Sequence, residues 1–506
     1  MLANPQSRFL SPFFLFEIFF GVVRGIKLEI WAHLVVGMYG MYLVSSRLFR
    51  LSSLSALVPA VVFMLSGMYA FNLAAGQSNF MSIAYVPFVY YFFVKGIDDF
   101  RAALVAGLFF ALMVFEGGSY TVPQTALFIA ILSVLMAIDQ RSFSPIKSIV
   151  ICGISGGLLG AVKLLPALEF IRMVPRYTVS SEAMSPLLFG RAMIGRIQEL
   201  SVSGVPGQAW GWEEYAHYVG LLPLLLAVVG SIVGLRKEWP LILTGLFFLV
   251  LAWGNFSEMS PWNILHQMPL FKSQRVPSRF MQYFVFAVAL LAGVAVERIG
   301  QSSLFRNSVE KRTGRLAVLF VLILITVDLI GVNSKAFSVA FPFSPPEIHR
   351  QDSFRQVAGD EEAMYQGFLE NFGTLDCYEE VHLPTMAIAL DDGEYRTGEV
   401  YMPEGKAELS YWSPNKITVA VEGAGPIMLN QNYVKGWRTK EGKEVFANEG
   451  FIATNVDRDD SEITFYYLPR SVVVGAIISF MSLLSVLILF LKPRVKAGAG
   501  VNKEME

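Results

Sequence analysis

The chain is poor in charged residues and in cysteine. Only 16% of its 506 residues are charged and 54% are hydrophobic, whereas soluble domains carry about 25% charged residues. Two cysteines, Cys152 in an apolar stretch and Cys377 in a polar one, are too few for a disulfide framework. The net charge of −1 gives no reason to expect nucleic acid as a partner. This composition excludes an ordinary soluble domain and predicts a polytopic α-helical membrane protein.

Motifs of soluble enzymes are also absent: there is no P-loop, no GxGxxG after a strand, and no HExxH, CxxC or GxSxG. The five histidines show no metal-ligand spacing, so a histidine-based metal site is not expected. They are His33, His217, His266, His349 and His382. His33 follows Glu29 by one helical turn, which we interpret as a helix-packing pair. The opening MLANPQSRFLSPFF lacks the basic and apolar regions of a signal peptide, so insertion is expected to rely on the first spanning helices.

Long apolar runs are abundant. A spanning helix needs about 20 apolar residues, and we expect eleven spans. They lie near 28–46, 53–71, 79–94, 102–115, 122–138, 148–165, 217–233, 239–254, 280–297, 316–333 and 471–491. Residues 1–27 form a loop and a short apolar piece, which indicates an interfacial or re-entrant segment. The sequence thus predicts a transmembrane domain over 1–333 and a C-terminal transmembrane helix over 471–491.

Charge bias predicts the orientation of these spans. Five loops that fall on one side and the tail 492–506 together hold 17 Lys and Arg in sixty residues, whereas the loops of the other side hold nine in 115. Because cytoplasmic loops are enriched in Lys and Arg, the first set is expected in the cytoplasm. The external loops 166–216 and 255–278 and the segment 334–470 are then expected outside it.

The segment 334–470 shows two patterns. Asp352 to Phe372 has helical spacing of its apolar residues, and from about 407 short alternating runs are separated by Gly, Asn and Asp. We expect strands near 407–412, 416–422, 426–432, 443–448, 451–456 and 461–467. The segment is therefore predicted to be an extracytoplasmic α+β domain whose β-rich part is a β-sandwich.

Ionisable residues close to apolar spans are costly and are often functional. Glu116 lies in the external turn FEGGSYTVPQ, where it is either an acid, base or metal ligand or a solvated carboxylate at a helix end. In VKLLPALEFIRMVPR, Lys163 and Glu169 flank Pro166 and are expected either to pair or to bind a phosphate, with Arg172 close by. Snorkelling to the interface is the structural alternative.

Two further groups have both a binding and a structural interpretation. Arg275 and Arg279 frame RVPSRF at the external end of a span, where guanidinium groups suit bidentate phosphate recognition or contact lipid headgroups. Trp412, Tyr433 and Trp437 in the predicted β-sandwich are suited to stacking on sugar rings, although packing within the domain is the commoner role of such residues.

Several segments resemble the YfhO family of bacterial membrane proteins. They include LANPQSRFLSPF, GMYGMYLVSSRLFRLSSLSALVPAVVFMLSGMYAFNLAAGQSNF, AYVPFV, LLPALEFI, HYVGLLPLLLAVVG, QRVPSRFM and YWSPNKITVAVEG followed by NQNYVKGW. The resemblance runs in order along nearly all of the chain. It implies a GT-C-like integral glycosyltransferase of the bacterial cytoplasmic (inner) membrane, with its large C-terminal domain on the outer face. Such proteins transfer a sugar from a polyprenyl-phosphate carrier to an acceptor outside the membrane.

Two departures from the family pattern matter. The family usually shows Gly-His before Asn-Phe, whereas this chain has Gln77 and Ser78 before Asn79. In the family, the equivalent of Leu2 to Ser7 follows a first spanning helix and most of an external loop that carries the Asp expected to act as base or metal ligand. The resemblance therefore implies that this chain lacks the first spanning helix and most of that loop, either because the sequence starts late or because this copy has lost the site, and that no residue of it takes that role.

Sugar transfer needs a base for the acceptor hydroxyl and cations for the departing phosphate. By position, Glu116 and Glu169 are the candidate catalytic carboxylates. The candidate substrate-binding residues are Lys163, Arg172, Arg275, Arg279, Asn79, Gln124 and Trp437. The expected partners are a polyprenyl-phosphate-linked sugar, a cell-envelope acceptor and membrane lipids. The sequence identifies no particular cofactor, and a divalent metal is compatible with sugar transfer of this kind. The alternatives are a transporter or flippase of a lipid-linked saccharide, and a non-catalytic protein of envelope polysaccharide assembly.

Overall fold

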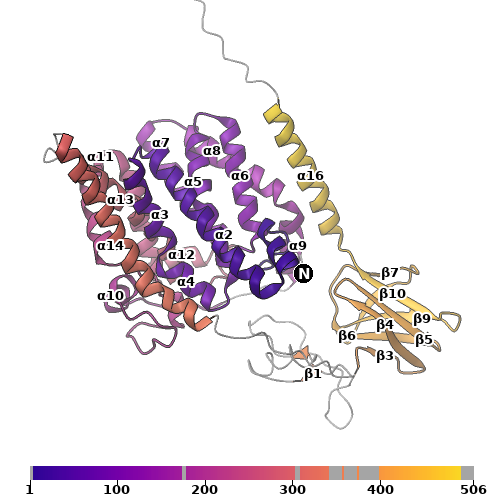
Figure 1. Ribbon diagram of the computed structural model, residues 1–506. Coiled ribbons are helices and arrows are strands. Elements are labelled where there is room, and N and C mark those ends of the chain that lie inside the picture. The colour runs from indigo at the N-terminus through magenta and orange to yellow at the C-terminus, as the bar shows by residue number, and fades with distance from the viewer. Residues whose placement is uncertain are drawn as a thin grey trace, which may run out of the picture.

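The computed structural model describes residues 4–173, 178–301, 308–340 and 398–491, with two isolated strands, β1 Gln356–Val357 and β2 Gly373–Thr374. They form a helical domain, a C-terminal β-sheet domain and a last helix, α16 (Figure 1). Six of the described helical segments are long and apolar enough to cross a membrane, or seven if the bent pair α8 and α9 is one span. The chain is therefore built as a membrane protein, with fewer clear spans than the eleven predicted.

The helical domain combines long and short helices. The long ones are α2 Val22–Leu43, α3 Ser53–Met64, α5 Val86–Lys95, α6 Phe100–Phe115, α7 Thr121–Gln140, α8 Ser144–Leu159, α9 Ala161–Met173, α11 Leu221–Ala252, α13 Met281–Gly300 and α14 Ser308–Ala340. The short ones are η1 Pro12–Phe14, α1 Leu15–Phe20, η2 Val44–Leu48, α4 Gly67–Ala74, η3 Ser78–Tyr85, α10 Pro186–Ile194, η4 Trp212–Glu214, α12 Pro261–His266 and η5 Pro277–Phe280. Among the candidate spans, the one that contains α13 is the most buried, and α16 Arg470–Leu491 is the least.

α11 bends back on itself. Just before it, Val219 N donates to Met193 O across 3.1 Å, and at its end Met184 N donates to Trp253 O across 3.0 Å, so both ends contact the segment that contains α10. A straight helix of its 32 residues would be about 48 Å long, which is too long for this arrangement. Its two halves correspond to the predicted spans 217–233 and 239–254.

Three predicted spans are interrupted. The span expected over 148–165 is two helices, α8 and α9, which meet at 83° at Gly160. The span expected over 53–71 is divided into α3 and α4, and the one expected over 79–94 begins as the 3-10 helix η3. The bend at Gly160 turns the chain sideways, so α9 does not continue the direction of α8.

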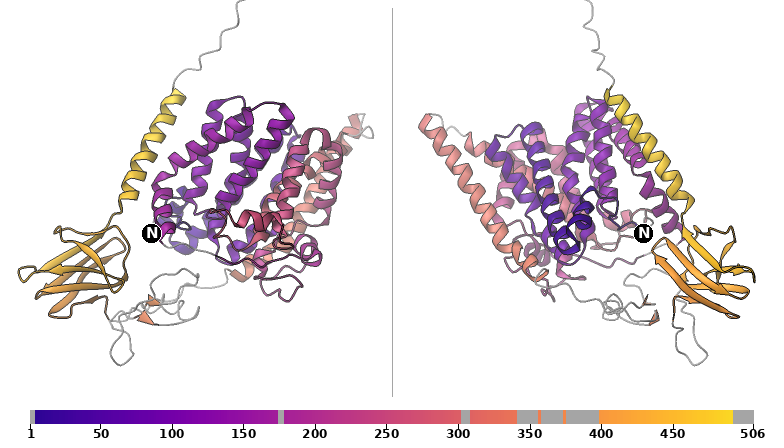
Figure 2. Two further views of the ribbon diagram at one scale, coloured as in Figure 1. Left: turned by 180° about the vertical axis from the view of Figure 1, so that it is seen from behind. Right: turned by 45° about the vertical axis from the view of Figure 1, so that its right-hand side comes forward.

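The helix ends form two faces. On the first, the basic face, residues in or next to the segments predicted to be cytoplasmic contact one another: Ser52 with Glu297, Ser148 with Phe93, Trp239 with Asp139, and Arg101 with Phe490. On the second, the loop face, residues in or next to the predicted external segments meet: Ser7 with Lys163, Ser11 with Glu116, Gln77 with Glu214, and Ser180 with Arg275. The β-sheet domain lies at the loop-face end of α16 (Figures 1 and 2).

The β-sheet domain contains two four-stranded antiparallel sheets, with strand orders β4-β5-β10-β7 and β3-β6-β9-β8. The strands are β3 Val400–Tyr401, β4 Lys406–Ser413, β5 Lys416–Glu422, β6 Gly425–Asn432, β7 Trp437–Thr439, β8 Val445–Asn448, β9 Phe451–Val456 and β10 Glu462–Tyr467. Alternation along β5 buries Ile417, Val419 and Val421, which pack with Ile463 and Phe465 of β10. The strands predicted from 407 onward are therefore confirmed, and the short strands β3 and β7 were not predicted.

Part of the predicted segment 334–470 lies outside the described residues. The helix expected over Asp352 to Phe372 falls there, except for Gln356 and Val357, which form strand β1 instead and pair in parallel with β2. The predicted tail 492–506 also lies outside them.

Candidate functional site

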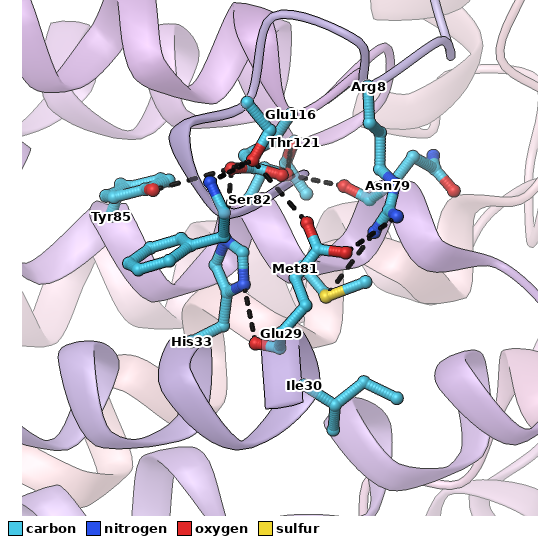
Figure 3. Close-up of polar contacts among 12 residues, drawn as sticks. Arg8, Glu29, Ile30, His33, Asn79, Met81, Ser82, Tyr85, Glu116 and Thr121 are labelled. Atoms are coloured by element: carbon cyan, nitrogen blue, oxygen red, sulfur yellow. Dashed lines mark hydrogen bonds and ion pairs between the residues drawn. The ribbon is translucent and has the colours of Figure 1, made fainter. Parts of the chain in front are cut away.

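Two carboxylates and an imidazole form a buried cluster at the loop-face end of the helical domain. Glu29 and His33 are one turn apart on α2, and Glu116 is the C-cap residue of α6. One carboxylate or ring-nitrogen atom of each lies within 4.8 Å of the others, and all three side chains are fully buried. Figure 3 shows them directed toward one another. We call Glu29, His33 and Glu116 the Glu–His cluster.

The burial of Glu116 follows from a tight turn after α6. Gly117 has a φ of +75°, and a Cβ at this position would lie 2.7 Å from the carbonyl carbon of Gln6. Glycine is therefore required for the opening loop to approach the turn. The loop covers the carboxylate, and Ser11 Oγ donates to Glu116 Oε1. The interpretation of Glu116 as a solvated carboxylate is thus wrong.

The partners of His33 define the roles of its two nitrogens. Nδ1 lies 2.9 Å from the backbone oxygen of Glu29, which can only accept, so Nδ1 is the donor. Nε2 lies 3.1 Å from Oε1 of Glu116. The Tyr85 hydroxyl donates to the same Oε1 across 3.4 Å. In the neutral imidazole, Nε2 is then an acceptor that faces a carboxylate.

Two buried basic side chains border the cluster. Arg8 Nη2 donates to Glu29 Oε2 across 2.8 Å and to Glu17 Oε1 across 2.9 Å. Lys163 Nζ donates to the backbone oxygen of Ser7. Among the described residues, Glu29 therefore has an arginine partner, whereas Glu116 forms no ion pair with a lysine or arginine.

An apolar cavity of about 310 Å³ lies beside the cluster. Its walls include Ile26 and Ile30 of α2, Leu73 of α4 and Met81 of η3. Arg8 Nη1 lies 3.5 Å from Met81 Sδ, so the arginine contacts both a residue of the cavity wall and Glu29 (Figure 3). An apolar group bound in the cavity would therefore be close to the buried charges.

A larger groove of about 550 Å³ lies between α9, the β-sheet domain and the start of α16. We call it the basic groove, and it is lined by Leu165, Leu168, Glu169, Arg172, Met173, Lys435, Arg470, Ser471 and Val474. Arg172, Lys435 and Arg470 are exposed, and the described part of the chain gives them no ion-pair partner. The groove thus combines apolar helix surfaces with an excess of positive charge.

α9 connects the cluster to the basic groove. Lys163 lies near its start and contacts the opening loop, whereas Glu169 and Arg172 face the groove. Lys163 and Glu169 are thus directed to different places and do not form the pair considered from the sequence. Nine helical positions separate Lys163 from Arg172, which is roughly 13 Å along the axis.

The two other arginines predicted to bind phosphate are engaged in protein contacts. Arg279 Nε donates to Glu214 Oε2 across 2.6 Å, and its guanidinium lies 4.0 Å from the ring centre of Tyr120. The guanidinium of Arg275 lies 4.8 Å from the ring centre of Trp210. Because Glu214 neutralises Arg279, a phosphate at this position would have to compete with the ion pair.

The remaining predicted substrate-binding residues lie in packed surroundings. Gln124 is buried between Gln274 and Gln282, and accepts from Gln282 Nε2 across 2.6 Å. Asn79 is buried at the start of η3, close to the cluster (Figure 3). Trp437 and Tyr433 pack against the core of the β-sheet domain, and Trp437 contacts Tyr467 at 5.4 Å between ring centres. Trp412 is exposed on β4.

Reasoning from the sequence missed three residues that the structure joins to the site. Glu29 and His33 were interpreted as a helix-packing pair, and Arg8 was not considered. Glu214, the partner of Arg279, was not considered either. The available signal was the cost of placing Glu29 in an apolar span, together with the short spacing from Arg8 to Glu17.

A scan against protein-family models finds no match, and no curated protein matches the sequence.

Proposed function

We propose that the protein is a GT-C-like membrane glycosyltransferase of the YfhO kind. It transfers a sugar from a polyprenyl-phosphate carrier to an envelope polymer or lipid. The observation that carries this proposal is the fully buried contact between His33 and Glu116, 3.1 Å apart at the loop face. Burying a carboxylate and an imidazole costs stability, and buried ionisable groups of this kind cluster at functional sites. Helix packing alone does not need them.

Glu116 is the group best suited to accept the proton of an acceptor hydroxyl. In the transfer, the acceptor oxygen forms a bond to the anomeric carbon and the bond from that carbon to the phosphate oxygen breaks. The hydroxyl proton passes to the carboxylate, and the lipid phosphate leaves with the bonding electrons. Ser11 Oγ and the Tyr85 hydroxyl both donate to Oε1 and fix the orientation of Glu116, which is the requirement for an effective general base.

The departing phosphate needs positive charge close to the reacting carbon, and Lys163 is the basic residue of α9 that borders the cluster. The basic groove is suited to attract and hold the lipid carrier before the transfer: Arg172, Lys435 and Arg470 supply positive charge for its phosphate, and Leu165, Leu168 and Val474 supply the apolar surface for a polyprenyl chain. Arg172 was predicted for this role, whereas Arg275 and Arg279 are replaced in it by Lys435 and Arg470. Glu169, the acidic residue among the groove residues, then lies near the donor rather than acting as base.

We further propose that the loop face is the outer face of a bacterial inner membrane. The charge bias supports this orientation, because the segments of the basic face carry the excess of Lys and Arg. In this orientation the β-sheet domain projects outward. The exposed Trp412 on β4 is then available to a polymeric acceptor.

The test is turnover in lipid nanodiscs with a panel of polyprenyl-phosphate sugars, with mass spectrometry detecting the released polyprenyl phosphate. Glu116→Gln is expected to reduce release by at least about 100-fold, as expected for removal of a general base. Glu258→Gln is the matched control, because Glu258 is an exposed carboxylate of a predicted external loop. Equal release by the two variants would overturn the assignment of Glu116. Movement of an intact donor across the bilayer without release would favour a flippase.

A further inference from the structure

The Glu–His cluster contains buried acceptors that lack a donor. His33 Nδ1 donates to a carbonyl, so Nε2 of the neutral ring presents a lone pair. This lone pair faces Glu116 Oε1 at 3.1 Å, and a carboxylate oxygen presents lone pairs as well. Two acceptors at this distance repel each other unless a positive charge lies between them.

A second observation concerns the other oxygen of Glu116. Oε2 is buried and has no hydrogen-bond partner among the described residues. A buried carboxylate oxygen without a partner is costly, because it has lost its water and gained nothing in exchange. The carboxylate thus has one oxygen free to bind a cation, next to a nitrogen that is also free.

The nearby basic side chains do not fill this position. Arg8 Nη2 is bonded to Glu29 Oε2 and to Glu17, and Lys163 Nζ is bonded to the backbone oxygen of Ser7. The donors that do reach Glu116, Ser11 Oγ and the Tyr85 hydroxyl, are both directed at Oε1.

We propose that Glu29, His33 and Glu116 bind a divalent metal ion of the Zn²⁺ or Mn²⁺ class. One imidazole and two carboxylates are ligands that such ions accept, and their ligand atoms lie within 4.8 Å of one another. The bond from His33 Nδ1 to a backbone carbonyl is the outer-shell arrangement of metal-binding histidines, since it directs Nε2 at the metal. The proposal does not depend on the reaction, because the same ligands would bind the ion in a transporter.

The direct test is metal content. Protein purified without chelator is analysed by inductively coupled plasma mass spectrometry, then stripped with EDTA and titrated with ZnCl2 or MnCl2 by calorimetry. We expect close to one ion per chain and at least a tenfold loss of affinity in Glu116→Gln and His33→Asn. Glu258→Gln is expected to retain the affinity of the unchanged protein. Equal affinity in all of these proteins, or no binding in any of them, would overturn the proposal.

X-ray absorption of the metal-loaded, unchanged protein provides a measurement that does not depend on the folding of variants. A nitrogen and oxygen shell with a single imidazole is expected. A shell without imidazole would place the ion elsewhere and contradict the proposal. Because both readouts are independent of sugar transfer, bound metal without turnover would reject the proposed function and support the metal site.

Discussion

Arg279 and Glu214 form a buried ion pair that joins η5 to η4, with Nε donating to Oε2 across 2.6 Å. Both side chains are less than a tenth exposed. Gln77 extends the pair, since its side chain contacts both partners at 3.1 Å. Burial raises the pKa of Glu214, but the Arg279 guanidinium more than offsets this and holds the pKa below its usual value.

We predict that Arg279→Gln lowers the stability of the protein by about 3–5 kcal/mol, because it leaves a buried carboxylate without its partner. Thermal unfolding in detergent measures the change. The double variant with Glu214→Gln should lose less than the sum of the two single variants. Arg275→Gln is the control, since a stacked guanidinium contributes about 0.5–2 kcal/mol. An additive double variant would contradict the coupling.

Glu182 predicts a pH dependence of stability. The side chain is 1% exposed and accepts from Trp210 Nε1 across 3.1 Å, and burial raises its pKa from 4.5 to about 8, with the nearby Glu214 adding to the rise. The unfolded chain then loses this proton before the folded one does. Stability therefore falls between about pH 4.5 and pH 8, by at most about 1.4 kcal/mol per pH unit.

Glu182→Gln keeps the acceptor for Trp210 and removes the titration. We expect it to unfold at a temperature similar to that of the unchanged protein at pH 5 and at a higher temperature at pH 9. Thermal unfolding at pH 5, 7 and 9 makes the comparison. A constant difference across this range would rule out Glu182 as the titrating group.

Glycine at 107 sets the distance between α6 and α8. A Cβ at Gly107 would lie 2.8 Å from both the Cys152 oxygen and the Gly156 nitrogen, whereas one at Gly157 would meet nothing within 4 Å. Gly107→Ala is predicted to cost about 1–3 kcal/mol through overpacking. The same change at Gly157 should be neutral or slightly stabilising in thermal unfolding. Equal effects at the two positions would show that helix propensity, not packing, decides.

The basic groove predicts a preference for anionic lipid. Replacing Arg172, Lys435 and Arg470 by Gln should reduce binding of polyprenyl phosphate at least tenfold, because the phosphate loses three cations. Native mass spectrometry of detergent-solubilised protein measures retained lipid. The control replaces Lys406, Arg438 and Lys440, which are exposed basic residues of the β-sheet domain that are not among the groove residues. Equal retention by the two triple variants would exclude the groove.

The β-sheet domain was the most predictable part of the fold. Along β5, the larger apolar residues Ile417, Val419 and Val421 occupy every second position, and this local period alone defines the strand and the side that faces the core. Gly442 and Gly450 could be predicted as turn residues in the same way, and both have positive φ in turns between strands. Strand alternation and turn glycines depend on residues that are neighbours in the sequence, so both can be predicted from the sequence.

The site was less predictable, because it depends on contacts between distant segments. Nothing in the pattern around Glu116 indicates that the loop at Ser11 covers it, and nothing near Glu214 indicates its pairing with Arg279. The bend at Gly160 was also missed, since hydropathy measures the length of an apolar run and not its direction. Contacts between side chains of distant segments can be identified only when the fold is known.

The bend between α8 and α9 has a consequence for biosynthesis. At this break, Val162 N lies at the start of α9 and Leu158 O at the end of α8, where backbone groups lack partners within their own helix. Ser479 of α16 bonds to both, at 3.0 and 3.3 Å. A ribosome must add the 317 residues that separate Val162 from Ser479 before this partner exists, roughly 15–60 s at about 5–20 residues per second. The backbone groups at the break therefore lack this partner until translation is almost complete, and a chain that ends before Ser479 never supplies it.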